Sequence, residues 1–205
     1  MKGPGVALLS RAVLVAALAS PVAVLAGAQQ YEPLADSVRA RLSAAIADKA
    51  VPSLRFKSAE DARRWLESMQ ARLETRIADR KQRLELLRTV HYEATRAGLD
   101  PQLVLGLLEV ESGFRKYAVS AAGARGYMQV MPFWTKLIGR RSDNLFHLRT
   151  NLRYGCVILR HYLDVEKGDY SRALGRYNGS LGKPEYPNLV LGAWRGKWKY
   201  DGPTA

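Results

Sequence analysis

The sequence predicts an all-α fold, with an α-dominated α+β fold as the most β structure it would allow. Apolar residues recur at helical spacing through much of the 205-residue chain, and helix-starting and helix-ending residues bound these segments. Only residues 127–131 alternate in a way that would suit a brief extended segment. The length suits one medium domain with an appendage.

Residues 1–28 are predicted to be a secretory signal peptide. Lys2 and Arg11 give a basic start, residues 12–25 are mostly apolar, and small residues precede a cleavage site before Gln29. The apolar run is short for a membrane span, so we expect no stable span in the mature chain, and localisation in the periplasm or cell wall. An uncleaved N-terminal anchor is the alternative.

Residues 29–83 are expected to form an N-terminal helical arm, and residues 84–205 a compact domain. Residues 34–49 could form an amphipathic helix, and Ser58 suits the cap of a long helix. Its apolar side runs from Leu66 to Leu87, residues 91–97 continue it, and Gly98 ends it. The outer face of this long helix alternates acidic and basic residues. A surface that follows nucleic-acid phosphates would be mostly basic, so a solvent-exposed face is expected.

The next predicted helix carries the main catalytic candidate. Asp100 is a good N-cap, and Gly113 is a natural stop. On a helical wheel Glu111 falls on the apolar face in the last turn, whereas Glu109 falls on the polar face. Burial and the negative end of the helix dipole both raise the pKa of a carboxyl group, which suits a general acid. The alternative is a partly buried glutamate paired with an arginine.

Further helices are expected as far as Tyr177, with small-residue loops between them. A loop rich in Ala, Gly and Ser spans residues 118–126, and the C-terminal aromatic residues are expected to belong to the core. The single cysteine, Cys156, cannot form an intrachain disulfide and is predicted to be buried. The later helices are expected from Pro132 to about Leu137, from Thr150 or Asn151 to about Lys167, and from Asp169 or Ser171 to Tyr177.

The formal net charge of +13 fits an anionic polymer or surface, and composition does not choose among nucleic acid, membrane and cell wall. No zinc-finger spacing or phosphate-binding loop points to nucleic acid or nucleotides. His91, His147 and His161 lack metal-ligand spacing, and His91 is expected on a helix surface. We therefore expect no metal, no cofactor and no nucleic-acid partner.

A second catalytic carboxylate is missing near Glu111. No Asp or Glu occurs from Ser112 to Ser142, and the acidic residues that follow lie at helix ends, where capping explains them. Most glycosidases use two carboxylates. If Glu111 cleaves a glycosidic bond, the substrate would have to supply the nucleophile, as the N-acetyl group of a 2-acetamido sugar can.

Four ordered blocks resemble the lytic transglycosylase family that has the soluble-transglycosylase, goose-lysozyme-like domain. The resemblance covers about residues 100–177, and Asn151 and Gly155 fit an N-x-x-x-G helix of that family. The blocks are Glu111-Ser112-Gly113-Phe114, Ser120 with Gly123-Ala124, Gly126-Tyr127-Met128-Gln129-Val130-Met131-Pro132, and Tyr177-Asn178.

The resemblance implies a lysozyme-like domain with a groove for peptidoglycan glycan strands. It implies cleavage of the bond between N-acetylmuramic acid and N-acetylglucosamine, leaving a 1,6-anhydromuramic end, with Glu111 as the single acid and base. Positions implied to bind substrate or order the groove are Ser120, Gln129, Met131, Tyr177 and Asn178, with the Tyr177 hydroxyl near the acid. The chain departs from the family pattern at Lys116-Tyr117, at Tyr127 and at Gly179-Ser180.

Two other functions stay open on the sequence. A hydrolase of goose-lysozyme type could use a similar acid residue, and its product would end in reducing muramic acid. Alternatively the protein could be a wall-binding component of an envelope assembly, because a catalytic domain does not obviously need the arm at residues 29–83. Envelope-machinery proteins are therefore possible partners beside the glycan strands.

Overall fold

The computed structural model describes residues 29–48, 50 and 52–203, and the predicted signal peptide lies outside them. The described residues form eight helices and no strand, which confirms the predicted all-α class. The extended segment expected at residues 127–131 amounts to isolated bridges that pair Arg125 with Val119 and Val130. The helices are α1 (Asp36–Ala47), α2 (Ala59–Leu73), α3 (Arg80–Arg96), α4 (Pro101–Ser112), α5 (Phe133–Ile138), α6 (Leu148–Val165), α7 (Tyr170–Asn178) and α8 (Glu185–Arg195).

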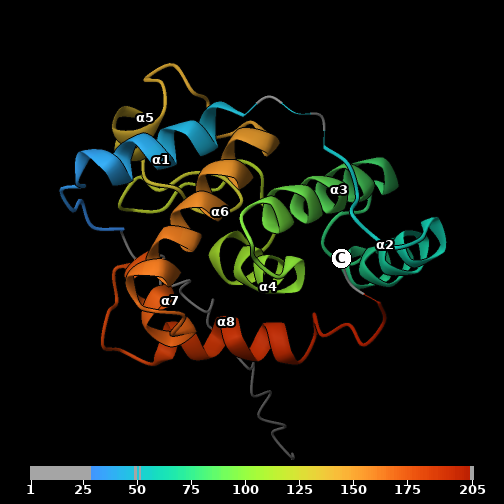
Figure 1. Ribbon diagram of the computed structural model, residues 1–205. Helices are drawn as coiled ribbons and strands as arrows, with labels where there is room; N and C mark the ends of the chain where they lie inside the picture. The colour runs from blue at the N-terminus through green and yellow to red at the C-terminus, as the bar shows by residue number, and fades with distance from the viewer. Residues whose placement is uncertain (1–28, 49, 51, 204–205) are drawn as a thin grey trace, which may run out of the picture.

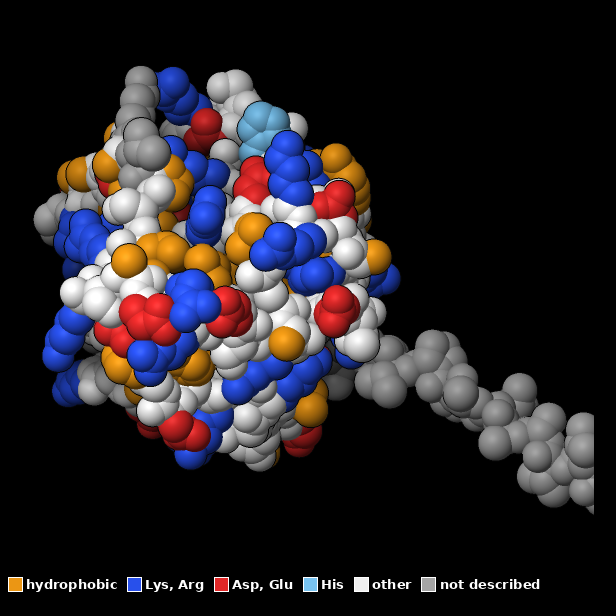
Figure 2. Space-filling view, turned by 90° about the vertical axis from the view of Figure 1, so that its right-hand side faces the viewer, with side chains coloured by type: hydrophobic (Ala, Val, Ile, Leu, Met, Phe, Trp, Pro, Cys, Tyr) orange, Lys and Arg blue, Asp and Glu red, His pale blue; other side chains and the backbone are white. Residues whose placement is uncertain are grey.

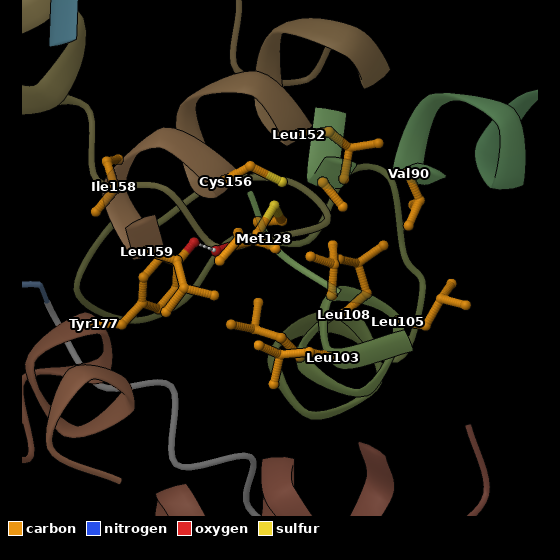
Figure 3. Close-up of a cluster of buried hydrophobic side chains, with 14 of the residues drawn as sticks. Val90, Leu103, Leu105, Leu108, Met128, Leu152, Cys156, Ile158, Leu159 and Tyr177 are labelled. Atoms are coloured by element: carbon orange, nitrogen blue, oxygen red, sulfur yellow. Dashed lines mark hydrogen bonds between the residues drawn. The ribbon is translucent and has the colours of Figure 1, made fainter. Parts of the chain in front are cut away.

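Helix α4 lies at the centre of the domain (Figure 1). It packs against α8 on one side and α3 on another, while α6 contacts both α3 and α7. Leu103, Leu105, Leu107 and Leu108 of α4 are fully buried. Figure 3 shows Met128, from the loop that follows α4, between the α4 leucines and the side chains of α6. A helix buried on all sides gives the residues at its end a fixed, dry environment.

Two predicted helix boundaries are wrong, because side chains make other bonds. The long helix expected from Ser58 is two helices, and Asp79 caps the second by accepting a hydrogen bond from the Gln82 N–H at 2.9 Å. Helix α6 begins at Leu148, before either expected cap. Asn151 lies fully buried in its first turn and bonds to residues outside the helix.

The arm packs on the domain through aromatic rings around His91. The ring of Phe56 stacks on His91 at a centroid distance of 4.4 Å, and Trp65 contacts it edge-on at 5.1 Å. His91 is 1% exposed, so the expected surface position is wrong. Its cover comes from elements far away in the sequence, and burial lowers its pKa to about 4.

A second contact fixes the C-terminal end of α1. Glu93 of α3 is fully buried, with Arg96, Arg149 and Arg153 at 3.1, 3.3 and 3.0 Å from its carboxylate. The three guanidinium groups also donate to the backbone carbonyls of residues 45, 46, 48 and 50. These carbonyls lack partners within α1, so this buried ion cluster attaches the arm to α3 and α6.

Cys156 is fully buried in α6, as expected, and burial raises the pKa of its thiol well above the ordinary value. Among the described residues, no helix is long and apolar enough to cross a membrane. On the face shown in Figure 2, Lys and Arg side chains are interspersed with acidic and apolar ones.

Candidate active site

Glu111 lies in the last turn of α4 and is 4% exposed, so its predicted burial is confirmed. Gly113 ends the helix in the left-handed conformation, with φ at +57°, as a C-cap glycine does. The N–H of Gly113 donates to the carbonyl of Glu109, which closes the last turn. The chain then leaves the helix directly after the carboxyl group.

Burial raises the pKa of Glu111 to about 8. Among the described residues no arginine pairs with Glu111, because the causes of this pKa shift are burial and a hydrogen bond from one phenol. A carboxyl group with this pKa is protonated at neutral pH, and it can give up its proton to a developing negative charge.

The phenol is that of Tyr186 in α8, whose hydroxyl donates to Glu111 Oε1 at 2.5 Å. This bond opposes the effect of burial and lowers the pKa of Glu111, whereas burial raises that of Tyr186 well above its ordinary value. Tyr186 is 4% exposed, so the core position expected for the C-terminal aromatic residues is confirmed for it. Its bond to the acid was missed, because the two residues are 75 positions apart and α8 was not predicted.

Tyr177, at the end of α7, lies beside the same acid without bonding to it directly. Its hydroxyl donates to the backbone carbonyl of Met128 at 2.7 Å, as drawn in Figure 3. Burial and then the charge of Glu111 raise the pKa of this phenol well above its ordinary value. The direct hydrogen-bond partner of the acid is therefore Tyr186, whereas Tyr177 fixes the loop that follows α4.

Asn151 holds that loop from the other side. Its Oδ1 accepts from the Met128 N–H at 2.8 Å, and its Nδ2 donates to the carbonyls of Arg125 and Leu145 at 2.8 and 2.9 Å. Gly126 has φ at +75°, and a Cβ there would lie 2.5 Å from Asn151 Nδ2. The loop can approach Asn151 this closely because residue 126 has no side chain.

Ser112 and Gln129 complete the loop. The Ser112 hydroxyl donates to the Tyr127 carbonyl at 2.8 Å, which joins the helix end to the loop. Gln129 is 3% exposed, has φ at +48°, and donates its side-chain amide to the carbonyls of Gly126 and Ala118 at 2.9 and 3.2 Å. Its side chain therefore orders the loop.

The remaining predicted site residues fall into two groups. Met131 is half-buried on the same loop, and Asn178, the last residue of α7, is buried beside Tyr177. Ser120 lies near the start of the loop, where its hydroxyl accepts from the Ala124 N–H at 3.1 Å. The contacts of Ser120 thus support the loop.

The later carboxylates have structural partners, but of the three described next only Asp169 caps a helix as expected. Asp143 accepts from the Tyr154 hydroxyl at 2.5 Å, Glu166 pairs with Arg176, and Asp169 caps α7. Within the described ranges no group of three or more His, Cys, Asp or Glu side chains could hold a metal ion. A cavity of about 430 Å³ lies between α1, α5 and α6, and none of the predicted site residues lines it.

Comparison with known proteins places this site in a recognised domain. Residues 88–186 match the family model of the transglycosylase SLT domain. A transglycosylase of Enterobacteria phage PRD1 is 32% identical over 115 residues, which are 53% of this chain and 42% of the phage protein.

Two bacterial relatives match shorter segments. Membrane-bound lytic murein transglycosylase C of Actinobacillus pleuropneumoniae serotype 5b (strain L20) is 52% identical over 52 residues, covering 25% of this chain and 13% of the relative. The protein of that name from Mannheimia succiniciproducens is 46% identical over 93 residues, covering 41% and 25%. The chain thus spans less than half the length of these relatives. Residues 88–186, which hold Glu111, Tyr177 and Tyr186, are therefore similar to the transglycosylase SLT domain.

Proposed function

We propose that this protein is a peptidoglycan lytic transglycosylase, secreted to the periplasm or cell wall. The observation that carries the proposal is one buried carboxylic acid, Glu111, with a pKa of about 8 and one phenol as its hydrogen-bond partner. The family supports the substrate class, since two of its relatives are named for action on murein. The division into an arm at residues 29–83 and a catalytic domain at residues 84–205 belongs to the same proposal.

In the first step, protonated Glu111 donates its proton to the glycosidic oxygen. The leaving sugar departs with a new 4-hydroxyl group while the acetamido oxygen of muramic acid attacks C1. This assistance by the substrate removes the need for a second protein carboxylate. Because Tyr186 donates to Oε1, the proton of the neutral acid resides on Oε2, and the bond orients that oxygen for transfer.

In the second step, the Glu111 carboxylate accepts the proton of the muramic 6-hydroxyl. The 6-oxygen attacks C1, the bond from the acetamido oxygen breaks, and the 1,6-anhydro ring forms. Glu111 returns to its acid form and no water is consumed. A hydrogen bond that lowers the pKa of Glu111 stabilises the carboxylate during this cycle.

The test is digestion of purified sacculi with the wild type and with Glu111→Gln, followed by mass spectrometry of the fragments. We expect anhydromuramic ends from the wild type and a rate lower by at least about 100-fold in the variant. Glu109→Gln, two residues earlier on the polar side of α4, is the matched control and should keep its activity. Equal rates for wild type and Glu111→Gln would refute the role of Glu111, and reducing muramic ends would instead identify a hydrolase.

A further inference from the structure

The described chain begins inside the predicted substrate site. Gln29 is 3% exposed. Its Oε1 accepts from the backbone N–H of Met131 at 3.1 Å, and its Nε2 lies 3.5 Å from the carbonyl of Gln129. The Tyr177 hydroxyl also hydrogen-bonds to the Gln29 side chain, which opposes the effect of burial on the pKa of that phenol. All three partners of Gln29 are residues implied above to bind substrate.

Residues 29–32, here called the N-terminal strap, are anchored on both sides of this position. The ring of Tyr31 meets Phe133 of α5 edge-on at a centroid distance of 5.8 Å. Glu32 pairs with Arg176 of α7 at 3.0 Å. The strap therefore joins α5 to α7 and passes beside the loop that contains Gln129 and Met131.

The chemistry of Gln29 matches that of a substrate group. A primary carboxamide presents a carbonyl oxygen that accepts and two N–H groups that donate, one of which points away from that oxygen, as the N–H of a trans secondary amide does. The 2-acetamido group of N-acetylglucosamine or N-acetylmuramic acid presents the same pair. A backbone N–H at Met131 and a backbone carbonyl at Gln129 would bind either of them in the same way.

We propose that the Gln29 side chain occupies the place of a substrate acetamido group, and that the glycan strand must displace the N-terminal strap to bind. The proposal rests on the proposed function, because it takes a 2-acetamido glycan as the ligand. The strap acts as an internal competitor, so the protein is autoinhibited until its N-terminal residues leave the site.

The contacts of the strap are suited to displacement. Tyr31 is 62% exposed, the Glu32–Arg176 pair is partly exposed, and one Gln29 bond has a long donor–acceptor distance of 3.5 Å. Exposed ion pairs and ordinary hydrogen bonds each contribute little net stability. We expect the strap to weaken binding of a glycan by about tenfold, the effect of losing one or two such bonds.

Binding to a catalytically silent protein tests this directly. In the Glu111→Gln background, Gln29→Ala is compared with Gln30→Ala, a control at the exposed neighbouring residue. Calorimetry measures the affinity for tri-N-acetylchitotriose and for chitotriose, which lacks the acetamido groups. We expect Gln29→Ala to tighten binding of the acetylated trimer by about tenfold, with no comparable gain for chitotriose or for Gln30→Ala.

Unchanged or weaker binding of the acetylated trimer by Gln29→Ala would overturn the proposal, as would an equal gain for both trimers. If Gln29→Ala does not fold, Tyr31→Ala loosens the strap from an exposed position and should shift the affinity in the same direction. The two proposals can fail separately. Wild-type protein that releases no anhydro ends from sacculi refutes the proposed function, whereas intact cleavage with no effect at Gln29 refutes only the strap.

Discussion

Replacing Glu111 by Gln should stabilise the protein at neutral pH and leave it almost unchanged in acid. The folded state raises the pKa of this carboxyl group to about 8 from an ordinary value of 4.5. Between these values the folded chain binds a proton that the unfolded chain has lost, so the free energy of unfolding falls as the pH rises. Gln has the shape of the neutral acid and no proton to lose, so the free energy of unfolding of the variant should not fall in this way.

The size of the effect follows from the pKa. The rise spans about 3.5 pH units, and each unit corresponds to about 1.4 kcal/mol. By pH 7 most of this interval has been crossed. The free energy of unfolding of Glu111→Gln minus that of the wild type should therefore be about 3 kcal/mol larger at pH 7 than near pH 4. Above pH 8 the gap should stop growing, at about 5 kcal/mol.

Urea unfolding of both proteins at a series of pH values from about 4 to 9 measures this gap. Glu109→Gln is the control, because Glu109 is only partly buried and pairs with Lys197, so its removal should give no gain that grows with pH. Parallel curves of unfolding free energy against pH for wild type and Glu111→Gln would refute the inference that Glu111 is held protonated.

Three further variants test the surroundings of the acid. Tyr186→Phe removes the hydrogen bond that lowers the pKa of Glu111. The fall in cleavage rate at alkaline pH should therefore move to higher pH, while the rate near pH 6 drops about tenfold or more. An alkaline fall at the same pH as in the wild type would contradict this. Asn151→Ala removes hydrogen bonds to three backbone groups and should lower the free energy of unfolding by about 2–4 kcal/mol in urea, and a loss below about 0.5 kcal/mol would exclude that role. Glu93→Gln leaves the buried arginine cluster with a neutral partner, so it should lower the free energy of unfolding by about 3–5 kcal/mol. As a control, Glu67→Gln at an exposed position should change that free energy by no more than about 0.5 kcal/mol.

Local features of the site could be read from the sequence. Asp100 and Gly113 bound α4 where capping rules put them. Helical periodicity alone placed Glu111 among leucines, so its burial and the direction of its pKa shift were predictable. Capping rules also predicted Asp169 or Ser171 at the start of the helix that ends near Tyr177, and Asp169 caps α7.

Features that depend on distant parts of the chain could not be read in this way. Tyr186 reaches Glu111 only because α8 packs along α4, and no local pattern carries that information. His91 looked exposed because its cover, Phe56 and Trp65, comes from the arm. Asn151 was expected to cap a helix, yet its amide bonds to a loop more than twenty residues earlier.

The buried ion cluster around Glu93 has a consequence for any shortened form of the protein. Three guanidinium groups surround that carboxylate. Some of their N–H groups do not reach the carboxylate and donate instead to carbonyl oxygens at the end of α1. A chain that begins at residue 84 would leave those guanidinium groups without the carbonyl oxygens that accept their hydrogen bonds. Water or a dissolved anion would have to replace those oxygens, so the stability of the trimmed chain should depend on the salt concentration more strongly than that of the intact protein.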